Sequence, residues 1–119
     1  MSTNYYHYER EPCECCGREF KARHIGKQMS GFKFLFQADF FGEYGEPIHS
    51  ADDWRKIIAK GGYIEARSGE TWRVSAEDFW LSVEAWTRNG RLRRHSDLDI
   101  GPRSYVDDAG FEMYDGEFS

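Results

Sequence analysis

The sequence lacks the features of a membrane or secreted protein. No apolar run approaches the roughly 18 to 20 residues that a membrane-spanning helix needs, and the longest candidate, residues 32–36, is short and contains a lysine. The N-terminal residues do not combine a basic start with an apolar segment, as a secretory signal would. We therefore expect a cytoplasmic protein that does not interact with membranes.

Cysteine is scarce and unevenly distributed. The chain has three cysteines, all within Cys13-Glu14-Cys15-Cys16. An odd number of clustered cysteines makes a poor disulfide framework and is more typical of a metal or thiol cluster. This agrees with a reducing compartment.

Positive charge is also in short supply. The chain has 16 Lys and Arg residues against 21 Asp and Glu residues, which gives a formal net charge of −5. A nucleic-acid-binding domain usually carries net positive charge, so the composition argues weakly against that class. The acidic excess lies mostly in residues 101–119, however, which leaves room for a basic patch upstream.

Aromatic residues, in contrast, are plentiful. Nine Phe, seven Tyr and four Trp make up 17% of the 119 residues, which excludes a wholly disordered chain because disordered chains are poor in aromatics. The length fits a single domain over residues 1–119.

Hydrophobic spacing predicts an α+β fold. Alternating patterns predict strands over 3–11, 18–25 and 32–40, with the last as the central strand, and shorter strands over 63–67 and 71–74. Helical spacing predicts two amphipathic helices, one from the N-cap Ser50 to Gly61 and one from the N-cap Ser75 to Asn89. An acidic hairpin is predicted over about 104–119. We expect a small antiparallel sheet with these two helices.

The first candidate site is Cys13-x-x-Cys16-Gly17. Two thiolates three residues apart can hold one tetrahedral zinc ion, because a tight turn directs both sulfur atoms inward. Gly17 permits the positive φ that such a turn requires. The alternatives are a free cysteine cluster and a thioredoxin-like redox pair.

A structural zinc site needs two further ligands. His24, on the strand after the knuckle, is the first choice, and His7, on the strand before it, is the second. Cys15 and His49 are reserves. The sequence therefore predicts a zinc-knuckle hairpin over about 3–27, with zinc bound by Cys13, Cys16, His24 and His7.

Two charged segments are candidate partner-binding surfaces. The basic one follows Trp86, whose ring could stack on a base, and contains Arg88, Arg91, Arg93 and Arg94. Four arginines in seven residues can contact phosphates, although a solvated helix end or a protein interface would show the same pattern.

The acidic segment lies near the C-terminus and includes Asp107, Asp108, Asp115 and Glu117. Carboxylates spaced like phosphates can imitate a nucleic-acid backbone. Ordinary solubility charge is the alternative.

No catalytic constellation is visible. The four histidines are scattered, and neither a zinc-protease helix motif nor a nucleophile-elbow motif occurs. We therefore expect a protein that is not an enzyme.

Several stretches resemble a family of small uncharacterised proteins encoded by bacteriophages and prophages. The specific part is the core formed by Cys13-x-x-Cys16-Gly17-Arg18 and His24-Ile25-Gly26-Lys27. Looser matches occur, in the same order along most of the chain, at Tyr5-Tyr6, Gly31-Phe32-x-Phe34, Asp53-Trp54, Asp108-x-Gly110-Phe111 and Gly116-Glu117-Phe118-Ser119.

The resemblance implies that Cys13, Cys16 and His24 form a zinc knuckle. Members of the family carry a histidine near the position of Gln37, so here the fourth ligand would be His7 or Cys15. The phage setting implies an accessory or counter-defence role, such as an anti-CRISPR protein, although this rests on association rather than on chemistry.

Two functions are therefore expected. The first is a phage-encoded, non-enzymatic binding protein that inhibits a host protein or ribonucleoprotein complex, such as a CRISPR or other defence nuclease complex. The second is a small zinc-containing nucleic-acid-binding protein that uses the arginine run and Lys27.

Overall fold

The computed structural model describes residues 2–11, 22–43, 45–90 and 104–115. In chain order the elements are β1 (Ser2–Tyr8), β2 (Arg23–Met29), β3 (Leu35–Ala38), α1 (Ala51–Ala59), β4 (Tyr63–Ser68), β5 (Glu70–Val74), α2 (Ala76–Asn89), β6 (Ser104–Val106) and β7 (Glu112–Asp115). The strands form one seven-stranded sheet in the order β5-β4-β1-β2-β3-β7-β6. All neighbouring strands are antiparallel except β3 and β7, which are parallel. The predicted α+β class is confirmed, with a larger sheet than expected.

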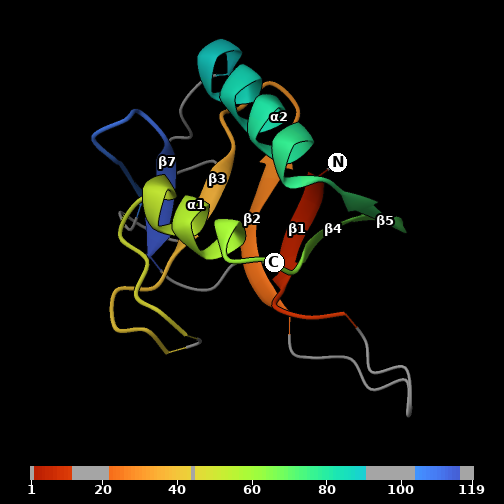
Figure 1. The fold of residues 1–119 in the computed structure, drawn as a ribbon. Helices are drawn as coiled ribbons and strands as arrows, with labels where there is room; N and C mark the ends of the chain where they lie inside the picture. Colours follow the sequence, from red (N-terminus) through yellow and green to blue (C-terminus); the bar gives the residue numbers. More distant parts are fainter. Residues whose placement is uncertain (1, 12–21, 44, 91–103, 116–119) are drawn as a thin grey trace.

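Both helices cover the same face of the sheet (Figure 1). They also contact each other, because the Arg55 guanidinium lies 4.1 Å from the ring centre of Trp80 and 3.5 Å from a carboxylate oxygen of Glu84. No described helix has the length and apolar composition required to cross a membrane. The other face of the sheet, which no described helix covers, is called the helix-free face below.

Aromatic rings dominate the core between the helices and the sheet. Tyr5 of β1 lies 5.6 Å from Phe34 and 5.3 Å from Phe79 of α2, measured between ring centres. Phe34 and Phe79 are fully buried. Burial of each such side chain stabilises the fold by roughly 1.5–3 kcal/mol, so the aromatic content noted in the sequence is used mainly for packing.

The helices begin and end as predicted, with Ser50 as the N-cap of α1 and Ser75 as the N-cap of α2. Ser75 caps α2 as expected, because its hydroxyl accepts the Asp78 N–H at 3.1 Å. At α1, the Asp53 carboxylate accepts the N–H of Ser50 at 3.2 Å. Asp107, 56 residues away, accepts the N–H of Ala51 at 2.9 Å. Negative groups at this end also suit the positive end of the helix dipole.

Two predicted strands have different bounds. Strand β2 begins at Arg23 and continues to Met29, so it includes residues expected to form a polar loop. Strand β3 spans only Leu35–Ala38 and is not central, since β2 occupies the middle of the sheet. The chain turns before β3, where the Phe32 N–H donates to the Met29 carbonyl, and Asp39 then pairs with Ile48 instead of a sheet neighbour.

The hairpins predicted for β4–β5 and β6–β7 are both present. Strands β1 and β2 also pair antiparallel, as the N-terminal hairpin requires. The segment that carries the cysteines, 12–21, lies outside the described residues, so the zinc knuckle itself stays a prediction.

Candidate binding surfaces

The two histidines predicted to bind zinc lie on opposite faces of the sheet. Tyr6 pairs with His24 across β1 and β2, so these two side chains share the helix-free face. His7 is the next residue along β1 and lies on the helix-covered face, where its Nε2 donates to the Gly61 carbonyl at 2.8 Å. One ion is therefore not expected to bind both histidines. Among the described residues, no three His, Cys, Asp or Glu side chains converge on a metal position, whereas Cys13, Cys15 and Cys16 lie outside them.

His24 has a well-defined environment on the helix-free face. Its ring stacks on Tyr6, with 4.8 Å between ring centres, and its Nε2 lies 3.1 Å from the Asn4 side-chain oxygen. The pKa of His24 is lowered from 6.5 to about 4, chiefly by burial and also by the charges of Lys27 and Arg67, while a backbone hydrogen bond at Gly26 opposes this shift. The imidazole is therefore neutral at physiological pH, which is the form that binds metals.

The helix-free face carries two rows of stacked side chains that run across the strands. In the first row Tyr6 lies between His24 of β2 and Arg67 of β4, whose guanidinium is 4.3 Å from the ring centre. In the second row, Tyr63 of β4 lies between Tyr8 of β1 at 4.7 Å and Arg73 of β5 at 3.9 Å.

A hydrogen bond from Arg67 to the Tyr8 hydroxyl links the two rows. The partners of Tyr6 and of Tyr63 come from strands on opposite sides, so both faces of each ring are covered. Stacking of nucleic-acid bases on these rings would require the rows to open.

His7 separates two hollows on the helix-covered side. One has a volume of about 280 Å³ and reaches the start of α2 at Ser75. The other, of about 290 Å³, has a mixed lining of acidic and basic residues that includes Arg23, Glu46 and Lys60. Glu46 is already paired with Lys60 and Arg23 with Asp39. These linings do not by themselves define a reaction.

The predicted basic surface is described only in part. Arg88 lies exposed in the last turn of α2, whereas Arg91, Arg93 and Arg94 lie outside the described residues. Trp86 packs against the core, with its ring centre 6.2 Å from those of Tyr5 and Phe34. The role of Trp86 as a platform for a base is therefore not supported, because the ring already serves to hold α2 on the sheet.

The predicted acidic surface also changes. Asp107 has a structural role, since Oδ2 accepts the Ala51 N–H and Oδ1 accepts the N–H groups of Ala109 and Phe111 at 3.0 and 2.9 Å. Its role as a phosphate-like carboxylate stays a prediction and gains no support, because both oxygens accept hydrogen bonds that fix a turn and a helix end. Asp108 is exposed and Asp115 is half-buried, while Glu117 lies outside the described residues.

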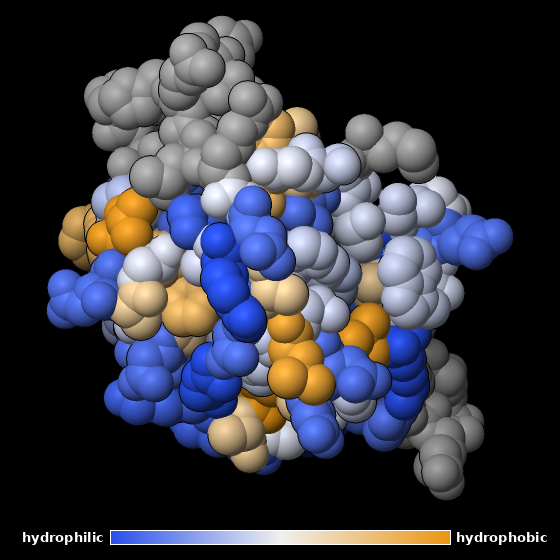
Figure 2. Space-filling view, turned by 90° about the horizontal axis from the view of Figure 1, so that it is seen from above, coloured by the Kyte–Doolittle hydropathy of each residue, from blue (hydrophilic) through white to orange (hydrophobic). Residues whose placement is uncertain are grey.

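The loop between β3 and α1 carries the most exposed large apolar side chain among the described residues. Phe41 is 90% exposed, compared with 60% for Leu81, 46% for Val106 and 44% for Trp72. On the face drawn in Figure 2, hydrophobic side chains form small separate patches among charged ones rather than one continuous surface. Most of the Phe41 side chain is thus in contact with solvent.

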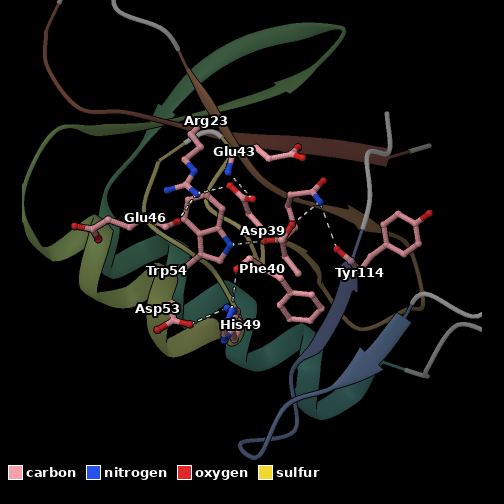
Figure 3. Close-up of polar contacts among 11 residues, drawn as sticks. Arg23, Asp39, Phe40, Glu43, Glu46, His49, Asp53, Trp54 and Tyr114 are labelled. Carbon is pink, nitrogen blue, oxygen red and sulfur yellow. Dashed lines mark hydrogen bonds and ion pairs between the residues drawn. The ribbon is translucent and has the colours of Figure 1, made fainter.

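Asp39 braces this loop (Figure 3). Its Oδ2 accepts a hydrogen bond from Arg23 at 2.9 Å, and its Oδ1 accepts the Glu43 N–H at 2.9 Å. The backbone of Asp39 also exchanges two hydrogen bonds with Ile48, at 2.9 and 2.8 Å. Arg23 reaches onward to the Glu46 carbonyl at 2.5 Å. The start, middle and end of the loop are therefore tied to one half-buried ion pair.

Phe40, the neighbour of Phe41, anchors the loop from the inside. Its ring centre lies 4.9 Å from that of His49 and 5.7 Å from that of Tyr105. His49 is thus part of the loop frame, and its role as a reserve zinc ligand stays a prediction because the cysteines lie outside the described residues. Phe40 therefore packs against neighbouring rings, whereas the side chain of the next residue, Phe41, is exposed to solvent.

Sequence reasoning missed Phe41 as a candidate site. The pair Phe40-Phe41 was read as the end of an alternating strand followed by a turn-rich loop, and alternation cannot show which of two adjacent rings is exposed. The turn residues that follow the pair, 42–47, could have indicated that Phe41 is exposed. An aromatic residue at the start of a turn has little sheet to pack against.

Comparison with protein-family models, curated proteins and solved structures finds no match for this chain. The fold class is therefore assigned from the described structure alone. The chain is an α+β protein with a seven-stranded sheet, two helices on one face and an exposed phenylalanine on a braced loop.

Proposed function

We propose that this protein is a phage-encoded, non-enzymatic binding protein that inhibits a host macromolecular complex. A CRISPR or other defence nuclease complex is the expected type of target. The observation that carries the proposal is Phe41, a large aromatic side chain left 90% exposed on a loop that is otherwise held in place.

Phe41 has the properties of an anchor for a protein partner. Transfer of a phenylalanine from water into an apolar pocket contributes roughly 1.5–3 kcal/mol. Aromatic anchors in well-packed pockets supply much of the binding free energy at interfaces. Because the loop is already ordered by Asp39, little conformational entropy is lost when it docks.

The charge around Phe41 favours one kind of partner. Glu43 and Glu46, on the same loop, are both exposed, and Glu46 is paired with Lys60. A hydrophobic pocket with a basic rim would complement this combination. Proteins that hold nucleic acid present basic grooves, so a nuclease complex offers such rims, whereas a nucleic acid or an anionic membrane would repel the loop.

The test combines capture with inhibition. The tagged protein is used to capture complexes from bacterial lysate in the presence of nuclease and high salt, and the nuclease activity of each captured complex is assayed. We expect wild type to retain and inhibit a specific complex and Phe41→Ala to lose both effects. Leu81→Ala, which truncates another exposed apolar residue, is the matched control and should behave as wild type.

Either of two results would refute the proposal. Retention and inhibition that are unchanged in Phe41→Ala would remove the loop as the anchor. Recovery of nucleic acid alone, lost at high salt, would instead favour a nucleic-acid-binding function.

A nucleic-acid-binding function is the second candidate. Arg67 and Arg73 favour it, because both guanidinium groups are about half exposed and are held in place by tyrosine rings on the helix-free face. Phosphate binding predicts that log affinity falls with log salt, with a slope of about −0.9 per neutralised phosphate on duplex DNA. Charge reversal at both arginines should then reduce that slope.

A further inference from the structure

Strand β5 is an edge of the sheet with an exposed surface. In the strand order β5 is terminal, and within the described residues it pairs only with β4. Residues 70–73 are all exposed, and only Val74 is half-buried. An edge strand presents backbone N–H and C=O groups that another strand can bind. Proteins commonly block such edges with proline, a bulge or charged side chains, especially lysine. The sequence of β5, ETWRV, contains no proline or lysine and carries one charge of each sign.

The two faces of β5 have different chemistry. On the helix-covered face Trp72 lies opposite Ala66 and Val74 opposite Ile64. Trp72 extends beyond the area that the helices cover, since 44% of it is exposed while Ala66 is fully buried. On the helix-free face the strand presents Thr71 and Arg73. An added strand would therefore meet an apolar side chain on one face and a cation on the other.

Arg73 is already oriented to bind a carboxylate. Its guanidinium lies 3.9 Å from the ring centre of Tyr63 and donates from both Nη atoms to the two Glu11 oxygens, at 2.7 and 2.6 Å. This bidentate arrangement is the geometry by which arginine recognises carboxylates. The hydrogen bond from Arg73 lowers the pKa of Glu11. Glu11 is itself 64% exposed, so an acidic side chain of another molecule can reach Arg73 by displacing Glu11.

We propose that the β5 edge binds an extended segment of a partner protein by strand addition. The segment places an acidic side chain against Arg73 and an apolar side chain against Trp72. Backbone hydrogen bonds supply affinity, and the two faces supply specificity. This site is independent of the Phe41 loop, and either can exist without the other.

A second copy of this chain is a poorer occupant than an acidic segment. If two β5 strands pair antiparallel with their helices on one side of the sheet, Thr71 of one copy lies opposite Arg73 of the other. No carboxylate from the second strand then meets Arg73. Charge complementarity therefore favours a partner with alternating acidic and apolar residues.

Two peptide probes test the proposal. One is a short peptide of alternating valine and glutamate, and the matched probe replaces glutamate with lysine. We expect the glutamate peptide to bind at least about tenfold more tightly, a difference of roughly 1.4 kcal/mol. Its binding should also slow hydrogen exchange of those β5 amides that do not bond to β4.

Three variants link binding to the named residues. Arg73→Glu should reverse the preference between the peptides, and Trp72→Ala should weaken binding of the glutamate peptide several-fold. Leu81→Ala, which truncates an exposed apolar residue of α2 rather than of the edge strand, should change neither. Circular dichroism and an unchanged melting temperature check that each variant is folded.

Three outcomes would overturn the proposal. The first is no binding of the glutamate peptide, or equal binding of both peptides. The second is binding without slower exchange at β5. The third is protection of the β5 amides that rises with protein concentration alone, which would assign the edge to a second copy.

Discussion

Acidification should destabilise the metal-free protein through His24. The pKa of this imidazole is lowered from 6.5 to about 4, chiefly because burial disfavours the charged form. Between these two values the unfolded chain takes up a proton that the folded chain does not. Stability from this group is therefore complete above the unfolded pKa of 6.5 and is lost as the pH falls toward 4.

The size of the effect follows from the shift. One pKa unit corresponds to about 1.36 kcal/mol, so a shift from 6.5 to about 4 corresponds to roughly 3 kcal/mol. The ring is partly exposed, which reduces this figure, and we expect a loss of about 2–3 kcal/mol. That is a large share of the roughly 5–15 kcal/mol by which domains of this kind are stable.

The assay is urea unfolding at a series of pH values in the presence of a chelator. The comparison is between wild type and His24→Phe, which keeps a ring against Tyr6 but binds no proton. Carboxylates titrate in both proteins, so the difference between their free energies of unfolding isolates His24. Parallel curves between pH 6.5 and 4, or an NMR titration of His24 near 6.5, would refute the reasoning.

Three further predictions concern the turns, a tyrosine and the knuckle. Gly62→Ala should cost roughly 2–5 kcal/mol, because at φ +85° its Cβ would lie 2.0 Å from a backbone oxygen of β1. Gly69→Ala, at φ +76° with open space around it, should cost only about 1–2 kcal/mol; equal costs in denaturant unfolding would contradict this. Burial and nearby carboxylates raise the pKa of Tyr105 to about 12, so stability should be lost as the pH rises from 10 toward 12. The phenolate absorbance should show a transition near the upper end of this pH range, and Tyr105→Phe should remove it. Cys13→Ser and Cys16→Ser should each lower the melting temperature sharply and release zinc, and unchanged melting curves together with zinc-free purified protein would refute the site.

The elements of the fold were predictable where local chemistry determines them. Both helices follow from apolar spacing between a serine and a glycine or asparagine, and the β4–β5 hairpin follows from the turn at Gly69. The bounds of β2 were missed because residues 27–29, which lie between two glycines and begin with Lys27 and Gln28, read as a loop. In the sheet, long-range pairing with β1 decides their conformation, and no local pattern reveals that pairing.

The surfaces were harder to predict than the elements. Asp107 looked like free acidic charge, but its oxygens bind backbone groups near residue 51 and within its own turn. Trp86 looked available because it precedes the arginine run, yet its ring belongs to the core. In both cases tertiary contacts far along the chain determine whether a side chain is free, and sequence spacing carries no record of them.

The alternation of side chains between the two faces of the sheet, along β1 and β2, also limits how a zinc site could be completed. Because His24 shares the helix-free face with Tyr6 while His7 lies on the other face, a knuckle that uses His24 would place its ion on the helix-free face. Zinc and a proton would then compete for the same imidazole. Added zinc should therefore move the acid-induced loss of stability of the wild-type protein to lower pH. In His24→Phe, added zinc should change the pH dependence of the free energy of unfolding much less. If zinc protects both proteins equally, His24 is not a ligand, and the knuckle must be completed by other residues such as Cys15.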